Sequence, residues 1–188
     1  MSQIILLNGI GSAGKSSIAR AFQDLAPTPF LHVQMDAFLA MLPPSSFGHP
    51  DGLVFEEAEH NDHKIINIRS GPTVALAMRA FRHSVAAMAG QGIDLIVDDV
   101  MFGPEWSEYA RLLAAHHVTK VGVLAPLEIL EAREAARGDR AIGLARGQWG
   151  RVHQGVTYDL TLDTSQATAE DCAARLLRHL ALAPGTAP

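Results

Sequence analysis

The sequence has a single cysteine, Cys172, so no disulfide can form within the chain, which agrees with a reducing cytoplasm. No apolar run is long enough to cross a bilayer, and the first residues lack the basic segment of a secretory signal. Lysine occurs only at Lys15, Lys64 and Lys120, the formal net charge is −5, and no basic stripe favours nucleic acid. We therefore expect a cytoplasmic protein with neither a nucleic-acid nor a membrane partner.

The composition and the order of apolar patterns indicate one α/β domain over residues 1–188. Hydrophobic residues make up 48% of the chain, which is enough for a single core. Strand-like runs are predicted at 4–7, 31–34, 94–98, 119–124 and 158–162. Helices are predicted at 15–25, from Pro72 to Gly90, after Pro104, after Pro126 and after Thr168. Such alternation predicts a five-stranded, mainly parallel sheet with helices on both faces.

The least regular part of the sequence is the segment 41–70. Its apolar runs at 53–55 and 64–68 are separated by a polar turn, which predicts a β-hairpin. The segment lies between the second and third predicted strands, so we interpret it as an insertion on the substrate side of one domain.

A phosphate-binding loop follows the first predicted strand. Residues 9–16 fit G-x-x-x-x-G-K-[ST] throughout, with an apolar strand before them and a helix after them. Glycines let successive backbone N–H groups point at phosphate oxygens, and the helix N-terminus adds partial positive charge. In this pattern Lys15 reaches the β- and γ-phosphates of ATP, and Ser16 binds Mg²⁺. The nucleotide would contact Gly9, Ile10, Gly11, Ser12, Ala13, Gly14, Lys15, Ser16 and Ser17.

Three aspartates lie at or just beyond predicted strand ends. Asp98 and Asp99 close the third strand, where a carboxylate that holds Mg²⁺ is expected. Neighbouring residues of a strand point to opposite faces, so their roles should differ, and the pattern leaves open which one serves the metal. Asp36 follows the second strand. It could accept a proton from an attacking hydroxyl or act as the N-cap of a helix over 37–41.

Arginines recur after the fourth strand in a way that predicts a lid over residues 126–150. Arg133, Arg137 and Arg140 share one helical face at i, i+4 and i+7. The like-charged pair weakens an isolated helix, and a transferring phosphoryl group would resolve the repulsion. A solvated charged face is the other interpretation.

These segments together resemble the chloramphenicol phosphotransferase family. The resemblance includes residues 5–9, the loop residues 12–16, Asp36, residues 97–100, Arg133-Glu134, residues 136–140, 153–156 and 158–159. It implies a three-layer P-loop NTPase fold like that of nucleotide and shikimate kinases. It also implies Mg-ATP-dependent phosphorylation of a primary hydroxyl, with Asp36 as the base.

We therefore expect an ATP-dependent O-phosphotransferase, most simply one that phosphorylates the 3-hydroxyl of a chloramphenicol-type antibiotic, as in resistance. ATP and Mg²⁺ are the expected cofactors. Lys15, Asp36, Arg133 and Arg137 are the expected catalytic residues, and Arg140 adds to nucleotide binding. Two alternatives stay open, a metabolite kinase of the same fold and a non-catalytic nucleotide-binding module. The acceptor, the oligomeric state and the biological role are not fixed by the sequence.

Overall fold

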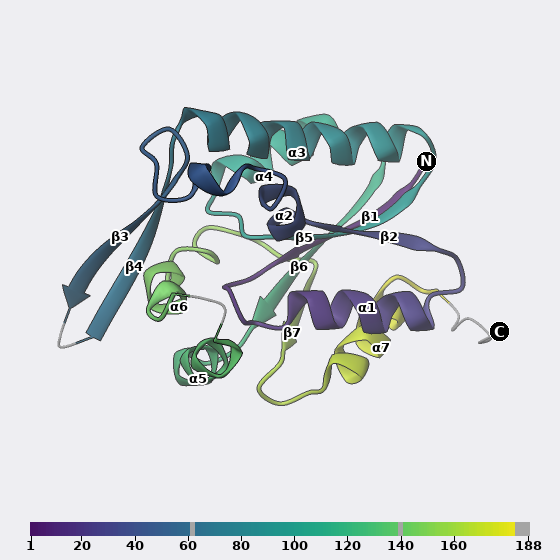
Figure 1. The fold of residues 1–188 in the computed structure, drawn as a ribbon. Helices are drawn as coiled ribbons and strands as arrows, with labels where there is room; N and C mark the ends of the chain where they lie inside the picture. Colours follow the sequence, from purple (N-terminus) through teal and green to yellow (C-terminus); the bar gives the residue numbers. More distant parts are fainter. Residues whose placement is uncertain (61–62, 139–140, 183–188) are drawn as a thin grey trace.

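The computed structural model describes residues 1–60, 63–138 and 141–182, and its central feature is a parallel five-stranded sheet (Figure 1). The strands lie in the order β2 (Phe30–Gln34), β5 (Asp94–Asp99), β1 (Gln3–Asn8), β6 (His117–Leu124) and β7 (Leu160–Asp163). The predicted α/β class and five parallel strands are confirmed. The last strand begins two residues later than predicted, and the Tyr158 ring just before it packs over Gly122 of β6.

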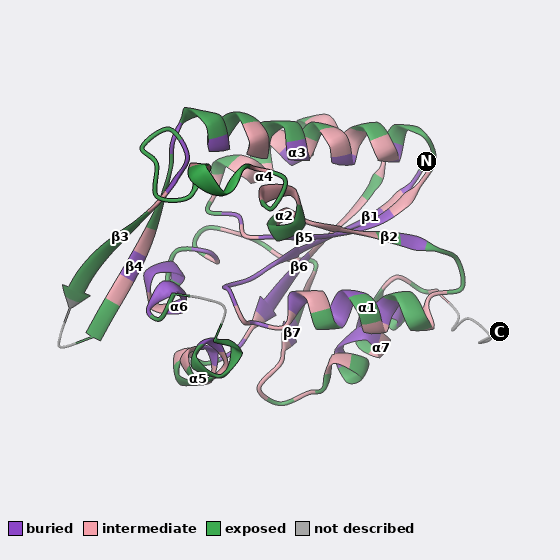
Figure 2. Ribbon diagram, in the orientation of Figure 1, coloured by how far each residue is buried: buried purple, intermediate pink, exposed green. Residues whose placement is uncertain are grey.

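Helices cover both faces of the sheet, as predicted. Helices α1 (Lys15–Leu25) and α7 (Ala169–His179) pack on one face, and α3 (Pro72–Gly90) and α4 (Pro104–Leu112) pack on the other (Figure 1). Alternate residues of β1 and β5 enter two separate hydrophobic cores, so the central strands are buried throughout (Figure 2). The α7 capping box at Thr168 is present, and Cys172 is buried.

The predicted hairpin is present and longer than its apolar runs. Strands β3 (Leu53–His60) and β4 (His63–Ser70) pair antiparallel and project from the body of the molecule (Figure 1). Cross-strand ion pairs join Lys64 to Glu57 and Arg69 to Glu56, each at 2.7 Å. Exposed pairs of this kind contribute at most about 1 kcal/mol each, so other contacts must hold the hairpin in place.

Short elements complete the structure around the carboxyl ends of the strands. They are α2 (Met35–Leu39), a 3₁₀ turn (Pro44–Ser46), α5 (Leu127–Arg137) and α6 (Leu144–Gln148). Helix α6 lies against β4, where the Ile66 N–H donates to the Gly143 carbonyl at 2.9 Å. In the part of the chain that the structure describes, no helix is long and apolar enough to span a membrane.

The contact between α6 and β4 depends on the absence of a side chain at Gly147. A Cβ built there would lie 1.9 Å from the Ile66 carbonyl oxygen, so Gly147→Ala must push the helix off the hairpin. We expect a loss of about 1–3 kcal/mol in the free energy of unfolding, measured by urea denaturation. Gly90→Ala is the matched control because a Cβ there meets nothing within 4 Å. Equal stability of the two variants would contradict the packing described.

Candidate active site

The phosphate loop joins β1 to α1 in a conformation that two of its glycines permit. A Cβ at Gly9 would lie 2.5 Å from the Val123 carbonyl oxygen, and Gly14 has a left-handed backbone with φ +96°. Helix α1 begins directly after Gly14 without a side-chain cap, so its first N–H groups remain available to an anion.

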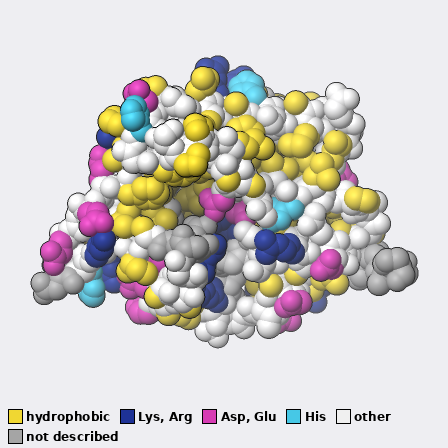
Figure 3. All heavy atoms as spheres, in the orientation of Figure 1, with side chains coloured by type: hydrophobic (Ala, Val, Ile, Leu, Met, Phe, Trp, Pro, Cys, Tyr) yellow, Lys and Arg dark blue, Asp and Glu magenta, His cyan; other side chains and the backbone are white. Residues whose placement is uncertain are grey.

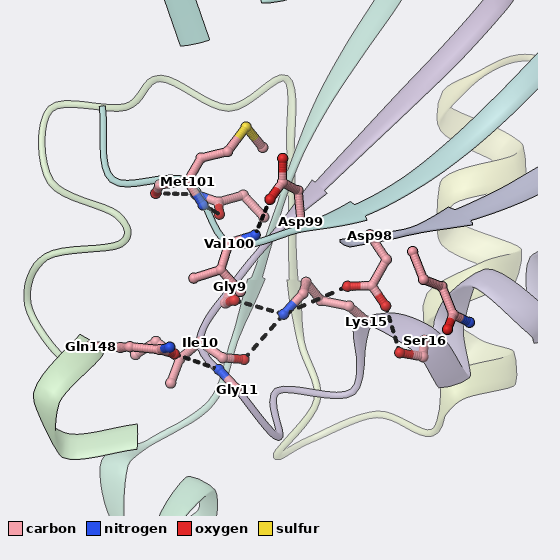
Figure 4. A network of polar contacts seen from close by, with 12 residues as sticks. Gly9, Ile10, Gly11, Lys15, Ser16, Asp98, Asp99, Val100, Met101 and Gln148 are labelled. Carbon is pink, nitrogen blue, oxygen red and sulfur yellow. Dashed lines mark hydrogen bonds and ion pairs between the residues drawn. The ribbon is translucent and has the colours of Figure 1, made fainter. Parts of the chain in front are cut away.

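Lys15 is buried and folds back over its own loop. Its Nζ donates to the carbonyls of Gly9 at 2.7 Å and Ile10 at 3.3 Å, and it lies 3.7 Å from Asp98 Oδ1 (Figure 4). A buried ammonium group is tolerated only when it is paired in this way.

Asp98 and Asp99 lie on opposite faces of β5, as the strand alternation predicts. The Asp98 carboxylate faces the loop and accepts a hydrogen bond from the Ser16 hydroxyl through Oδ2 (Figure 4). Burial alone would raise the pKa of Asp98, but the Lys15 ammonium, His32 and the Ser16 hydroxyl outweigh it and hold that pKa below its usual value. Asp98 is therefore a charged carboxylate beside the loop.

Asp99 belongs instead to the face covered by α3 and α4. Its carboxylate accepts the Val100 N–H at 2.7 Å and the Tyr109 hydroxyl at 3.0 Å. Burial raises the pKa of Asp99 to about 6, and these two hydrogen bonds oppose the rise only in part. The structure thus separates the two predicted metal ligands and brings only Asp98 to the loop.

A cleft of about 790 Å³ lies over the phosphate loop, and several of the predicted residues line it. They are Gly11, Ser12, Gly14, Lys15, Ser16, Ser17, Asp36, Asp98, Arg133 and Arg137. Figure 3 shows a hollow near the centre of this face, with acidic, basic and hydrophobic side chains around it. Gly9, Ile10 and Ala13 also belong to the loop, but they are buried and do not line the cleft.

Asp36 is the second residue of α2, and its side chain is exposed. The N-cap is Gln34, so the capping interpretation of Asp36 is wrong. The β2 strand ends just before it, which puts the carboxylate at the edge of the sheet where the loop also lies.

Helix α5 supplies the arginines. The Arg133 guanidinium donates to the Thr164 hydroxyl at 2.9 Å and to the Thr164 carbonyl at 2.8 Å. Arg137 also lines the cleft, and Arg140 lies outside the described residues. The structure therefore brings two arginines of the predicted group to the phosphate loop.

Sequence patterns did not reveal three polar residues around the loop. Gln148 Oε1 accepts the Gly11 N–H at 2.8 Å (Figure 4), and the Thr164 hydroxyl donates to the Ala13 carbonyl at 2.9 Å. His32 of β2 lies beside Asp98. Gln148 and Thr164 are 137 and 151 residues from their loop partners, so no local spacing could have pointed to them.

The contacts of Glu134 were also not evident from sequence patterns. It is buried on α5, and its carboxylate accepts the N–H groups of Gly143 at 2.8 Å and Ala145 at 2.8 Å. Arg146 and Glu131 share two further hydrogen bonds of 2.7 and 2.9 Å. Helix α5 thus anchors α6, which in turn touches both the hairpin and, through Gln148, the phosphate loop.

Comparison with known proteins agrees with this site. A family model described as chloramphenicol phosphotransferase-like protein matches residues 2–181. A Mycobacterium tuberculosis H37Rv protein named as a candidate O-phosphotransferase is 35% identical over 180 residues, which are 93% of this chain and 80% of that protein. A Janibacter sugar kinase has a TM-score of 0.65 at 18% identity over 99% of both chains. Mycobacterium tuberculosis APS kinase CysC, solved with AMPPNP and APS, has a TM-score of 0.63 at 16% identity over 96% of this chain and 98% of its own.

The fold, the phosphate loop and the O-phosphotransferase relative define a P-loop phosphotransferase that acts on hydroxyl groups. Within that class, the chain belongs to the chloramphenicol phosphotransferase-like family, whose model covers nearly all of it.

The raised pKa of Asp99 predicts a pH-dependent loss of stability. A carboxyl group whose pKa is higher in the folded state makes its full contribution to stability below its ordinary pKa of 3.8. That contribution is lost as the pH rises through the folded-state pKa of about 6. Asp99→Asn keeps an acceptor for Val100 and a donor for Tyr109 but carries no charge. We expect the unfolding free energy of the variant, relative to wild type, to increase by about 1–3 kcal/mol from pH 4 to pH 8. A difference that stays flat or falls would contradict this.

Proposed function

We propose that this protein transfers the γ-phosphate of ATP to a hydroxyl group of a small molecule. The observation that carries the proposal is the cleft over the phosphate loop, which is lined by a lysine, three arginines and two aspartates. We take residues 1–188 as one kinase domain, with 41–70 on the acceptor side and 126–150 as the arginine lid.

The phosphates of ATP would lie along the loop from Gly9 to Ser17. Mg²⁺ prefers oxygen ligands, and the Ser16 hydroxyl and the charged Asp98 carboxylate supply two of them at adjacent positions. Those residues would hold the ion, which when bound neutralises charge on the β- and γ-phosphates. Asp99 faces the other core and has no place in this metal site.

Lys15, Arg133 and Arg137 would stabilise the charge that develops during transfer. Lys15 must exchange the Gly9 and Ile10 carbonyls for phosphate oxygens, which are stronger partners for an ammonium group. Arg133 is held by Thr164 beside the loop, so its position is set before the nucleotide arrives. Arg140 would add a third guanidinium.

Asp36 would act as the general base. The acceptor oxygen attacks the γ-phosphorus, the bond from that phosphorus to the ADP oxygen breaks, and the hydroxyl proton moves to the Asp36 carboxylate. Such a base contributes about 10²- to 10⁴-fold to the rate when it is correctly placed. The remaining catalysis is positioning of the acceptor and charge stabilisation.

A chloramphenicol-type antibiotic is the acceptor that family membership favours. Exposed aromatic residues on the acceptor side, Phe47 and Phe55, suit an acceptor with an apolar ring. The similarity to a sugar kinase keeps a polar metabolite as the second candidate, which the same experiment separates from the first.

The proposal predicts phosphorylated chloramphenicol, detected by mass spectrometry, when the protein is incubated with Mg-ATP and the drug. Asp36→Asn should lower kcat by about 10²-fold or more while ATP binding is kept, because the amide cannot accept the proton. Lys15→Ala should lose both turnover and ATP affinity.

Asp24→Asn is the matched control, since Asp24 is an exposed aspartate of α1 that lies outside 41–70 and does not line the cleft. Intact ATP binding without drug product would eliminate chloramphenicol and direct the search to other hydroxylated compounds. Turnover by Asp36→Asn at the wild-type rate would refute the assigned base.

A further inference from the structure

His32 is a buried imidazole that the proposed reaction does not use. It lies on β2, its side chain is 7% exposed, and its Nε2 is 3.7 Å from Asp98 Oδ2. His32 pairs with Ile96 in the β2–β5 ladder, so it shares a sheet face with Asp98, two residues further along β5. The cleft over the phosphate loop is lined by Asp98 and not by His32.

The neighbour of His32 on the same strand fixes which ring nitrogen carries the proton. Gln34 Nε2 lies 3.1 Å from His32 Nδ1. With the Gln34 amide in this orientation its nitrogen donates, so Nδ1 accepts and a ring proton is on Nε2. That buried Nε2 has no hydrogen-bond partner among the described residues. The nearest carboxylate oxygen of Asp98, Oδ2, lies 3.7 Å away, just beyond hydrogen-bond distance.

The three groups beside Asp98 would respond differently to nucleotide binding. Lys15 and Ser16 belong to the phosphate loop, and in the proposed function both turn toward phosphate and metal. His32 comes from the sheet and does not line the cleft, so it can stay beside Asp98 whether the nucleotide is bound or not. An outer residue of this kind fixes the orientation of a metal-binding carboxylate.

We propose that His32 is a positioning residue whose Nε2–H holds Oδ2 of Asp98 and leaves Oδ1, the oxygen on the Lys15 side, for the nucleotide-bound Mg²⁺. This inference rests on the proposed use of Asp98 as a metal ligand. A histidine that merely packs would affect stability and leave metal affinity unchanged, which gives the two roles different readouts.

The test measures Mn²⁺ binding to the protein with ADP by electron paramagnetic resonance, since ADP allows no turnover. His32→Leu removes the donor and should weaken Mn²⁺ binding about 10-fold or more. His32→Gln can place an amide N–H near the same point and should stay within about 3-fold of wild type. His116→Leu is the control because that half-buried imidazole instead accepts the Ser2 N–H.

Nitrogen-15 NMR of the labelled wild-type protein gives a second readout that needs no variant to fold. It should report a proton on His32 Nε2, and an Nε2 that carries no proton would overturn the proposal. Wild-type Mn²⁺ affinity in His32→Leu, with or without a lowered melting temperature, would also overturn it. If the wild-type protein itself binds no Mn²⁺ in the presence of ADP, the proposed function is wrong as well. If wild type binds Mn²⁺ and His32→Leu binds it equally well, only the role of His32 is wrong.

Discussion

One buried carboxylate, that of Asp98, joins the phosphate loop to the sheet. Its oxygens face Lys15 and Ser16 from the loop and His32 from the neighbouring strand. A charge at this depth is stable only with such partners, so the three groups and the carboxylate require one another. The loop therefore reaches its conformation because β5 places this acid beside β1, and the rest of the cleft is arranged around that junction.

The strand order explains why the other residues of the cleft collect at the same edge. In a parallel sheet the carboxyl ends of the strands lie together, and β2, β5 and β1 are neighbours. The ends of these strands lead directly to Asp36, Asp98 and Gly9. Asp36, Asp98 and the phosphate loop thus meet although long stretches of sequence separate them. Helix α5 approaches the same edge and adds its arginines through the contact with Thr164.

Local patterns in the sequence were sufficient for the fold and for half of the site. Apolar runs predicted the strands, the glycines and Lys15 predicted the loop, and Thr168 predicted the start of the last helix. Each of these signals acts within a few residues. Alternation along β5 also predicted that Asp98 and Asp99 would differ, but only the packing of the two cores assigns Asp98 to the loop.

The rest of the site depends on contacts between distant segments, which spacing cannot encode. Glu134 stands among charged residues in the sequence, and in the structure it is a buried acceptor for the start of α6. Gln148 has no motif around it, yet it accepts a loop N–H. The capping interpretation of Asp36 was wrong because α2 begins two residues earlier than the pattern suggested.

A crystal structure with Mg²⁺ and a non-hydrolysable ATP analogue would test the central claim most directly. The account predicts the triphosphate along Gly9–Ser17, the metal between Ser16 and Asp98, and Lys15 moved from its own loop carbonyls to the phosphates. An analogue bound elsewhere, or a metal held by Asp99, would contradict it.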